Sequence, residues 1–173
     1  LRLLATRGCE VRAVPCDAGP AEILDGDPDG IAFSPGPGDP ANLSYAIRSM
    51  EQVATRGLPI LGICLGHQLM GWAFGGRTFK LKFGHRGSNH PVKDLVRAGK
   101  VHITAQNHGY AVDADSIKGS GLQVSHINLN DGTVEGLRHR EWPVFSIQYH
   151  SEASPGPLDS TYLFEQFLEM VGK

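Results

Sequence analysis

The sequence predicts an α/β protein built on an open, mixed, mainly parallel sheet, flanked by helices and with an antiparallel, strand-rich middle. Short β-rich apolar runs alternate with helical patterns along the chain, which is typical of strands connected through helices. Residues 77–140 contain several strand candidates and no long helical pattern, which indicates antiparallel pairing there. An apolar run at 59–63 passes directly into a helical pattern.

The start of the sequence lacks a strand that the fold is expected to have. Residues 1–8 read as the end of an amphipathic helix with no strand before it, so we expect the first strand of the fold to be missing. We expect residues 1–173 to form a single domain that is N-terminally truncated or part of a longer chain. Asn130-Asp131-Gly132 is a hairpin turn signal. The strand candidates are residues 10–15, 30–34, 59–63, 78–81, 101–106, 122–128, 133–139 and 144–149.

Three helices are expected between and after these strands. The first follows Asp39-Pro40, the second begins directly after Cys64 and ends near Gly75-Gly76, and the third begins near Ser160. Apolar residues at helical spacing predict the buried faces of the first and third helices. These residues are Ala46, Met50, Val53 and Ala54 in the first, and Phe164, Phe167, Leu168 and Val171 in the third.

Composition excludes several classes of function. Hydrophobic residues are 40% and charged residues 20% of the 173, as in ordinary globular proteins. The formal net charge of −2 gives no electrostatic reason to bind nucleic acid or an anionic membrane, and no apolar run is long enough to span a bilayer. Cys9, Cys16 and Cys64 form no CxxC pair, so we expect neither a disulfide framework nor structural zinc, and a cytoplasmic location fits.

Cys64 lies where a strand turns abruptly into a helix, between Gly62 and Gly66. Glycine at both positions permits a turn too tight for residues with a Cβ, and the pattern is the cysteine form of a nucleophile elbow. The free amides at the helix start favour the thiolate. The alternative is an inert, buried cysteine that packs as a small hydrophobe.

A thiolate nucleophile needs a base and a third group that orients the base. The last strand candidate leads into His150, and Glu152 follows two residues later. Positions i and i+2 of extended backbone point to the same side, so Glu152 can hold one ring nitrogen while the other faces Cys64. One alternative is a histidine with a purely structural place. Another is a metal site, although no zinc-ligand spacing is present among His67, His85, His90, His150 and Glu152.

Residues 34–40 read Ser-Pro-Gly-Pro-Gly-Asp-Pro between a strand and a helix. Proline has no N–H, so the available donors are the amides of Gly36 and Gly38, and a rigid loop of this kind suits an oxyanion hole or a substrate backbone. The loop has neither a GxGxxG pattern nor a Walker lysine, which makes nucleotide binding a weak interpretation. A stiff turn without function is the other alternative.

Four segments together resemble the class I (triad-type) glutamine amidotransferases. They are Pro-Gly-Pro-Gly-Asp-Pro at 35–40, Gly-Ile-Cys-Leu-Gly-His-Gln at 62–68, Gln-Asn-His-Gly-Tyr at 106–110 and Gln-Tyr-His-x-Glu at 148–152. The segments 84–92 and 154–157 are similar to the small, glutamine-hydrolysing subunits of carbamoyl-phosphate synthetases. The resemblance covers nearly the whole chain.

The resemblance implies a role for each matching residue. Cys64 would be the nucleophile, His150 the general base and then acid, and Glu152 the group that orients His150. The amides of Gly36 and Leu65 would hold the oxyanion. The α-amino and α-carboxylate ends of glutamine would be held by Gly38, Gln68, Asn107, Gly109 and Tyr110.

The chain departs from the family pattern in two places. Ser151 stands where the family usually has proline; because proline supplies no catalytic atom, we expect only a modest kinetic effect. The family also has an additional N-terminal domain upstream, one serine of which contacts glutamine, so the site here is expected to be incomplete.

The resemblance implies hydrolysis of glutamine to glutamate and ammonia without a cofactor in this chain. The ammonia would pass through a tunnel to a large synthetase subunit, which uses ATP and bicarbonate to make carbamoyl phosphate for arginine and pyrimidine synthesis. The expected partners are therefore glutamine, the missing N-terminal domain and that large subunit. Two alternatives stay open: the glutaminase subunit of an anthranilate or GMP synthetase, and a non-catalytic docking module on the same fold.

Overall fold

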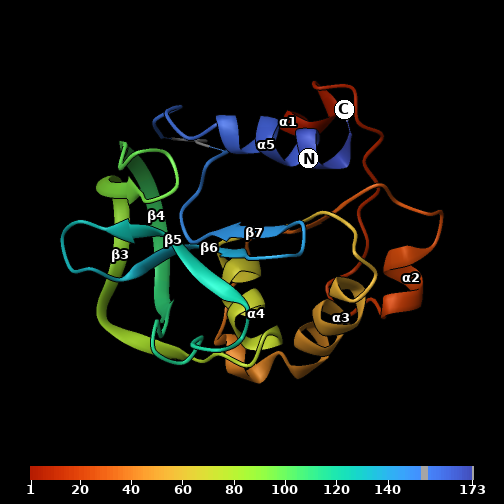
Figure 1. Ribbon diagram of the computed structural model, residues 1–173, viewed down its shortest axis with the longest axis horizontal. Coiled ribbons are helices and arrows are strands. Elements are labelled where there is room, and N and C mark those ends of the chain that lie inside the picture. The colour runs from red at the N-terminus through yellow and green to blue at the C-terminus, as the bar shows by residue number, and fades with distance from the viewer. Residues whose placement is uncertain (153–155, 173) are drawn as a thin grey trace.

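The computed structural model describes residues 1–152 and 156–172 (Figure 1). Within these residues seven strands form one sheet: β1 (Ile31–Phe33), β2 (Ile60–Ile63), β3 (Thr78–Asp94), β4 (Val101–Val112), β5 (Leu122–Asn128), β6 (Val134–His139) and β7 (Val144–Ile147). The helices are α1 (Arg2–Ala5), α2 (Pro20–Leu24), the 3₁₀ helix η1 (Pro40–Asn42), α3 (Ser44–Ala54), α4 (Leu65–Ala73) and α5 (Tyr162–Val171). No described helix combines the length and apolar character that crossing a bilayer requires.

The sheet is open and mixed, as expected, with the strand order β1-β2-β7-β6-β5-β3-β4. β1, β2 and β7 run parallel to one another, and the other neighbouring pairs are antiparallel. The antiparallel strands lie in the middle of the chain, also as expected. Parallel pairing covers a smaller part of the sheet than the sequence suggested, because short connections add β3 to β6 to the same sheet, and only antiparallel strands can be joined so closely.

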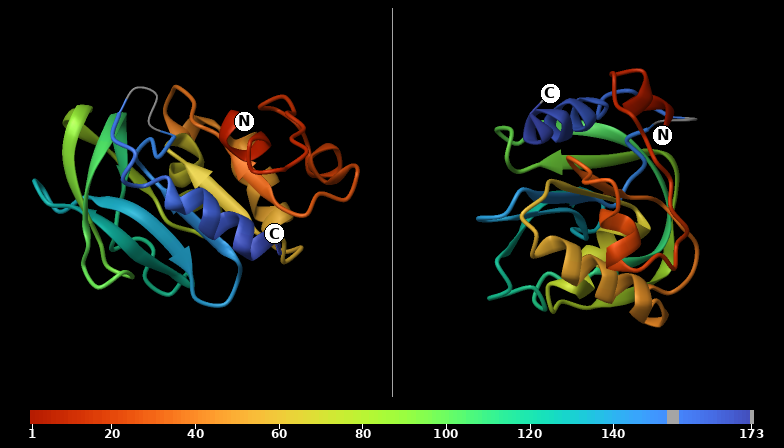
Figure 2. Two further views of the ribbon diagram at one scale, coloured as in Figure 1. Left: turned by 90° about the horizontal axis from the view of Figure 1, so that it is seen from above. Right: turned by 90° about the vertical axis from the view of Figure 1, so that its right-hand side faces the viewer.

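Helices cover both faces of the parallel part (Figures 1 and 2). On one face α3 and α4 pack against Ile60 and Val144, and on the other α1 and α5 pack against Leu61 and Phe145. Successive residues of β2 and β7 thus enter opposite cores, because side chains alternate across a strand. The long β3–β4 ribbon stands at the end of the sheet opposite β1.

Most expected elements are present with small shifts of their ends. The hairpin at Asn130-Asp131-Gly132 joins β5 to β6, with the Gly132 amide donating to the Asn128 carbonyl at 2.9 Å. β3 extends far beyond the expected residues 78–81. Its pairing with β4 shifts register between Lys80 and His85 and again between Gly87 and His90, so the strand continues through two irregularities of the kind that bulges make.

Residues 10–15 form no strand, contrary to expectation. A strand needs a hydrogen-bonding neighbour, and in the described part of the chain the edge strand β1 pairs with β2 alone. The segment leads instead to α2, a short helix that the sequence analysis did not anticipate. Arg12 attaches it there, because its Nη1 donates to Asp25 Oδ2 at 2.8 Å.

Candidate active site

The connection between β2 and α4 places Cys64 at a strained position. Cys64 has φ 53° and ψ −101°, a backbone conformation that is rare for a residue with a side chain and is found at functional sites. A Cβ on Gly62 would meet the Gly66 carbonyl oxygen at 2.7 Å, and one on Gly66 would overlap the backbone of Phe33. Only glycine at both positions lets α4 begin this close to the sheet, so the segment forms the elbow that the sequence predicts.

The structure brings His150 and Glu152 to this elbow. The Cys64 amide donates to the carbonyl of Ile147, the last residue of β7, at 2.9 Å, and the His150 amide donates to the carbonyl of Ala105 on β4 at 2.9 Å. The His150 ring interacts with the Cys64 side chain. Its Nδ1 lies 2.7 Å from Glu152 Oε1, so the three side chains form one series of neighbours.

This series sets the charges of its members. The hydrogen bond with Cys64 is the main cause that raises the pKa of His150 to about 10, with Glu152 adding to it and burial opposing it. Burial alone would raise the pKa of Glu152, but the hydrogen bond from His150 outweighs it and the pKa lies below its usual value. A carboxylate therefore faces an imidazolium that holds a proton beside the sulfur, as general acid catalysis requires.

The loop at 34–40 meets the first turn of α4. A Cβ on Gly36 would lie 2.6 Å from Leu65 Cδ2, so the loop packs closely on the residue that follows Cys64. Gly38 has φ 104°, which only glycine adopts readily. Among the residues described, the amides of Leu65 and Gly66 donate to no carbonyl, as is usual at the start of a helix.

The segment 107–110 joins the same neighbourhood from β4. Gln68 Nε2 donates to the Tyr110 carbonyl at 2.9 Å and to Gln148 Oε1 at 3.1 Å. Burial and an interaction of its hydroxyl with Asp39 raise the pKa of Tyr110, so this ring lies near the loop at 34–40. Asn107 is exposed and Gly109 half-buried, whereas Gln68 is 3% exposed and its amide nitrogen already has protein acceptors.

Comparison with known proteins identifies a family. The family model of class I glutamine amidotransferases matches residues 1–170. The chain belongs to the class I glutamine amidotransferase family. It is 56% identical over 171 residues to the carbamoyl phosphate synthase small chain of Staphylococcus epidermidis, covering 99% of this chain and 46% of that protein. The small chain of a Synechococcus strain is also 56% identical over 171 residues, covering 99% of this chain and 43% of that protein.

A solved structure shares the fold. A crystal structure of a Thermoplasma acidophilum protein assigned as a GMP synthase subunit superposes with a TM-score of 0.79 and 23% identity, covering 99% of this chain and 84% of that one. This amidotransferase chain spans a little less than half the length of the curated relatives that it matches. The resemblance to carbamoyl-phosphate synthetase small subunits, which the sequence suggested, is confirmed at the level of similarity. Ser154 and Pro155 of one quoted segment lie outside the described residues.

The amidotransferase also contains polar residues for which the sequence analysis found no role. Gln148 Nε2 donates to the Cys64 carbonyl at 3.4 Å, beneath the elbow. A set of polar side chains connected by hydrogen bonds lies further along the sheet, around β3, β4, β5 and β6. We call this set the buried polar network. The alternation of Thr104, Gln106 and His108 along one strand was the available signal, but the partners of these residues come from other strands. The members of the network are His85, Gln106, His108, Asn128, Asp131 and Glu135.

The residues of the alternative metal site do not gather in one place. His67 is buried with Nδ1 2.9 Å from Ser146 Oγ, and burial lowers its pKa to about 3, so it is neutral and structural. A different set, His85, His108 and Glu135, has potential ligand atoms within 4.8 Å of one another. Every such atom in this set has a hydrogen-bond partner within the described part of the protein, so the three residues belong to the buried polar network.

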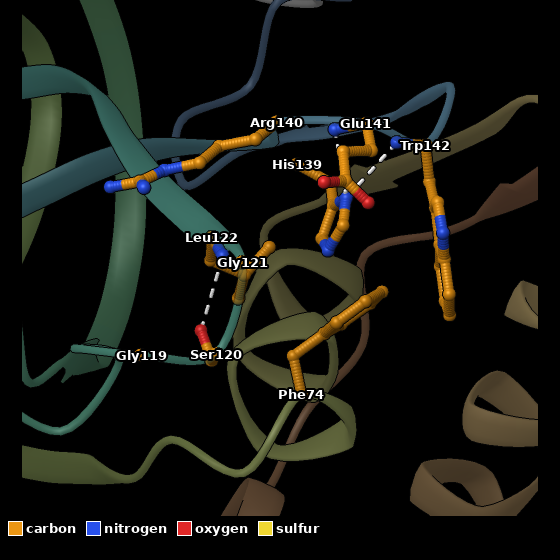
Figure 3. Close-up of a pocket in the computed structure, with 9 residues that line it drawn as sticks. All are labelled: Phe74, Gly119, Ser120, Gly121, Leu122, His139, Arg140, Glu141 and Trp142. Atoms are coloured by element: carbon orange, nitrogen blue, oxygen red, sulfur yellow. Dashed lines mark hydrogen bonds between the residues drawn. The ribbon is translucent and has the colours of Figure 1, made fainter.

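A cavity of about 450 Å³ lies elsewhere, between the end of α4 and the turns beside β5 and β6 (Figure 3). Its wall is aromatic: the His139 and Trp142 rings stack with centroids 4.9 Å apart, and Phe74 approaches both. His139 Nδ1 accepts the amides of Glu141 and Trp142, and burial lowers its pKa. None of its lining residues belongs to the Cys64 site, and none pairs a nucleophile with a base.

Proposed function

We propose that this chain is the glutamine-hydrolysing domain of a carbamoyl-phosphate synthase small subunit. One observation carries the proposal: His150 lies between Cys64 and Glu152 at a strained strand-to-helix turn. A nucleophile, a base beside it and a group that orients the base are the parts that acyl transfer needs.

In the proposed reaction the Cys64 thiolate attacks the δ-carbonyl carbon of glutamine. The oxyanion lies between the amides of Gly36 and Leu65, each of which should contribute a factor on the order of 10²–10³ to the rate. Collapse breaks the C–N bond, and His150 gives its proton to the departing ammonia, leaving a γ-glutamyl thioester. His150 then takes a proton from water, which attacks the thioester and releases glutamate and the thiolate. These steps use no metal and no organic cofactor.

Recognition of glutamine would come from the segments that meet around α4. Gly38, Gln68, Asn107, Gly109 and Tyr110 would hold the α-amino and α-carboxylate ends. The positions of Tyr110 and Gln68, joined through the Tyr110 carbonyl, support this assignment.

The ammonia would pass to a large synthetase subunit, where ATP and bicarbonate would be used. The support is the name of the relatives, which are small chains of carbamoyl phosphate synthase. Because those relatives are about twice as long, a further domain would accompany this one in the working protein. The carbamoyl phosphate would be used in the cytoplasm for arginine and pyrimidine synthesis.

Two rival functions are less well supported. A subunit of an anthranilate or GMP synthetase would share the elbow and the triad, but the high identity is to carbamoyl phosphate synthase small chains, and the GMP synthase likeness at 23% identity concerns the fold. A docking module without activity would have no use for an imidazolium held between a thiol and a carboxylate.

The test is ammonia release from glutamine by the intact protein, with and without a cognate large subunit. We expect low activity alone and higher activity in the complex, and loss of activity in Cys64→Ala with both preparations. Equal rates with and without the large subunit would remove the coupling but keep the hydrolase. Unchanged ammonia release by Cys64→Ala would refute the proposed function.

A further inference from the structure

A buried carboxylate on β6 anchors the buried polar network. The Glu135 side chain is 0% exposed. Its oxygens accept hydrogen bonds from Asn128 Nδ2 at 2.9 Å, Gln106 Nε2 at 2.9 Å and His85 Nδ1 at 3.2 Å. Since all three partners donate, Glu135 is held as a carboxylate, and a buried charge of this kind persists only when it is bonded and compensated.

His85 supplies the compensating charge. Its Nε2 lies 2.9 Å from Asp131 Oδ2, so each ring nitrogen faces a carboxylate. The hydrogen bond with Glu135 is the main cause that raises the pKa of His85, and Asp131 adds to it against the effect of burial. The imidazolium form of His85, with each nitrogen facing an acid, is therefore favoured.

Glu135 fixes Gln106 in one orientation. Gln106 Nε2 donates to Glu135 Oε2 at 2.9 Å and to Thr104 Oγ1 at 3.1 Å. Turning the amide over would place its oxygen against the carboxylate, two acceptors face to face. The amide oxygen must therefore point the other way, where it lies 2.9 Å from His108 Nε2.

This orientation determines how many hydrogens His108 must carry. Its Nε2 faces the Gln106 oxygen, and its Nδ1 lies 2.7 Å from the Tyr110 carbonyl oxygen. Both partners can only accept, so His108 makes both bonds only when both ring nitrogens carry hydrogen. A neutral ring would donate to one oxygen and turn a lone pair toward the other.

The Tyr110 carbonyl is the point at which the network reaches the candidate site. It accepts from His108 and, at 2.9 Å, from Gln68 Nε2 on the first turns of α4. Tyr110 also closes the segment 107–110, which is proposed to hold the ends of glutamine. Without the His108 bond this carbonyl loses one of the two side-chain donors that hold it.

We propose that Glu135 is a positioning residue for glutamine binding: through Gln106 it lets His108 hold the Gln106 oxygen and the Tyr110 carbonyl together only while His108 is doubly protonated. Glutamine binding is then linked to a proton. The KM for glutamine should rise with increasing pH, while kcat, which depends on His150 and Cys64, should not follow the same curve. The inference rests on the proposed function, because a KM exists only if the chain hydrolyses glutamine.

Charged groups on every neighbouring element set the pH of the transition. Burial is the largest influence on the pKa of His108 and lowers it below the ordinary 6.5; Glu135 opposes this, and positive His85 and His150 reinforce it. His67 on α4 is neutral, since its pKa is about 3. The transition in KM therefore belongs on the acidic side of pH 6.5.

The test compares Glu135→Gln with Glu141→Gln in the intact protein, with KM and kcat measured between about pH 5 and 8. Glu141 is exposed and lies between β6 and β7, so it provides the same chemical change outside the network. In wild type and Glu141→Gln we expect KM to rise roughly three- to tenfold across the transition, the factor that one hydrogen bond supplies. In Glu135→Gln the new amide can donate to the oxygen of a Gln106 side chain that has turned over. The Gln106 amide nitrogen then donates to a neutral His108, so KM should not change with pH.

A wild-type KM that does not change with pH, or an equal rise in Glu135→Gln, would overturn the proposal. If Glu135→Gln does not fold, ¹⁵N NMR of the histidine rings of the wild-type protein decides. Hydrogen on both His108 nitrogens below the transition supports the proposal, and a single hydrogen at every pH overturns it. A folded protein that releases no ammonia refutes the proposed function, and the NMR measurement still tests the network.

Discussion

His150 Nδ1 lies 2.7 Å from Glu152 Oε1, although both residues belong to a segment that follows β7 without regular structure. The segment is held by the bond from the His150 amide to Ala105 on β4, so the ring is placed by the sheet and its charge by the carboxylate. Ser151 between them is 1% exposed, and the structure gives its hydroxyl no hydrogen-bond partner in the described residues. The pairing of ring and carboxylate therefore depends on backbone position more than on Ser151.

Replacing Glu152 with glutamine should move the alkaline limit of activity to lower pH. The imidazolium form of His150 is stabilised by Cys64 and by Glu152, which together raise its pKa to about 10. Removing the negative charge makes the protonated ring less favourable, so this pKa falls, by about 1 to 3 units for a close opposite charge. The rate that needs the proton is then lost earlier as pH rises, and kcat should fall by about 10²–10⁴.

The measurement is a pH–rate profile of glutamine hydrolysis for Glu152→Gln and wild type. Glu165→Gln is the control, because that carboxylate pairs with Arg7 at the surface and its removal should leave the profile unchanged. An alkaline limb that stays in place in Glu152→Gln would show that the carboxylate does not set the charge of His150.

An electrophilic analogue of glutamine should modify Cys64 and neither of the other cysteines. Cys16 is exposed and Cys9 half-buried, so a general alkylating reagent can reach them, whereas only Cys64 has a histidine beside its sulfur. Mass spectrometry of the labelled peptides should place a diazoketone analogue on Cys64, with protection by glutamine. Cys16→Ala should label normally; a label that persists in Cys64→Ala would contradict the assignment.

The sequence predicted the parts of the site that are local in the chain. The elbow needs a strand, two glycines and a helix within a dozen residues, and each glycine is required by an approach that the neighbouring residues themselves create. The pairing of His150 with Glu152 could likewise be inferred from their spacing. β5 lies where the pattern placed it, and the strong turn signal that follows it marks its end.

The features that the sequence did not predict depend on partners far along the chain. Residues 10–15 have the composition of a strand but no neighbour to pair with. The strand candidate at 78–81 covers only the start of β3, because the rest of β3 depends on its pairing with β4, which shifts register twice. Glu135 reads as an ordinary strand residue, since its burial follows only from the register of β6 against its neighbours.

Replacing Tyr110 with phenylalanine should weaken glutamine binding while chemistry stays nearly unchanged. Its hydroxyl connects to Asp39, the residue that follows the two glycines of the loop at 34–40. Without that bond the loop and β4 lose a connection across the binding side, so KM should rise roughly three- to tenfold. Steady-state kinetics would check this, with Tyr45→Phe on α3 as the control; an unchanged KM in Tyr110→Phe would mean that the connection does not shape the site.

Replacing Gly66 with alanine should destabilise the protein and displace the nucleophile. A Cβ at this position would overlap the Phe33 carbonyl, which belongs to backbone held in the β1–β2 ladder and cannot move aside. Overpacking of this kind costs about 1–3 kcal/mol of unfolding free energy. Gly19→Ala is the matched control, because Gly19 has φ −76° and a Cβ added there would have nothing within 4 Å. The midpoint of denaturant unfolding should be lower for Gly66→Ala than for Gly19→Ala. The hydrolysis rate of folded Gly66→Ala should also fall, because α4 can then begin only further from β1. A Gly66→Ala protein with the midpoint and rate of wild type would mean that α4 does not depend on this approach to hold Cys64 at the end of β2.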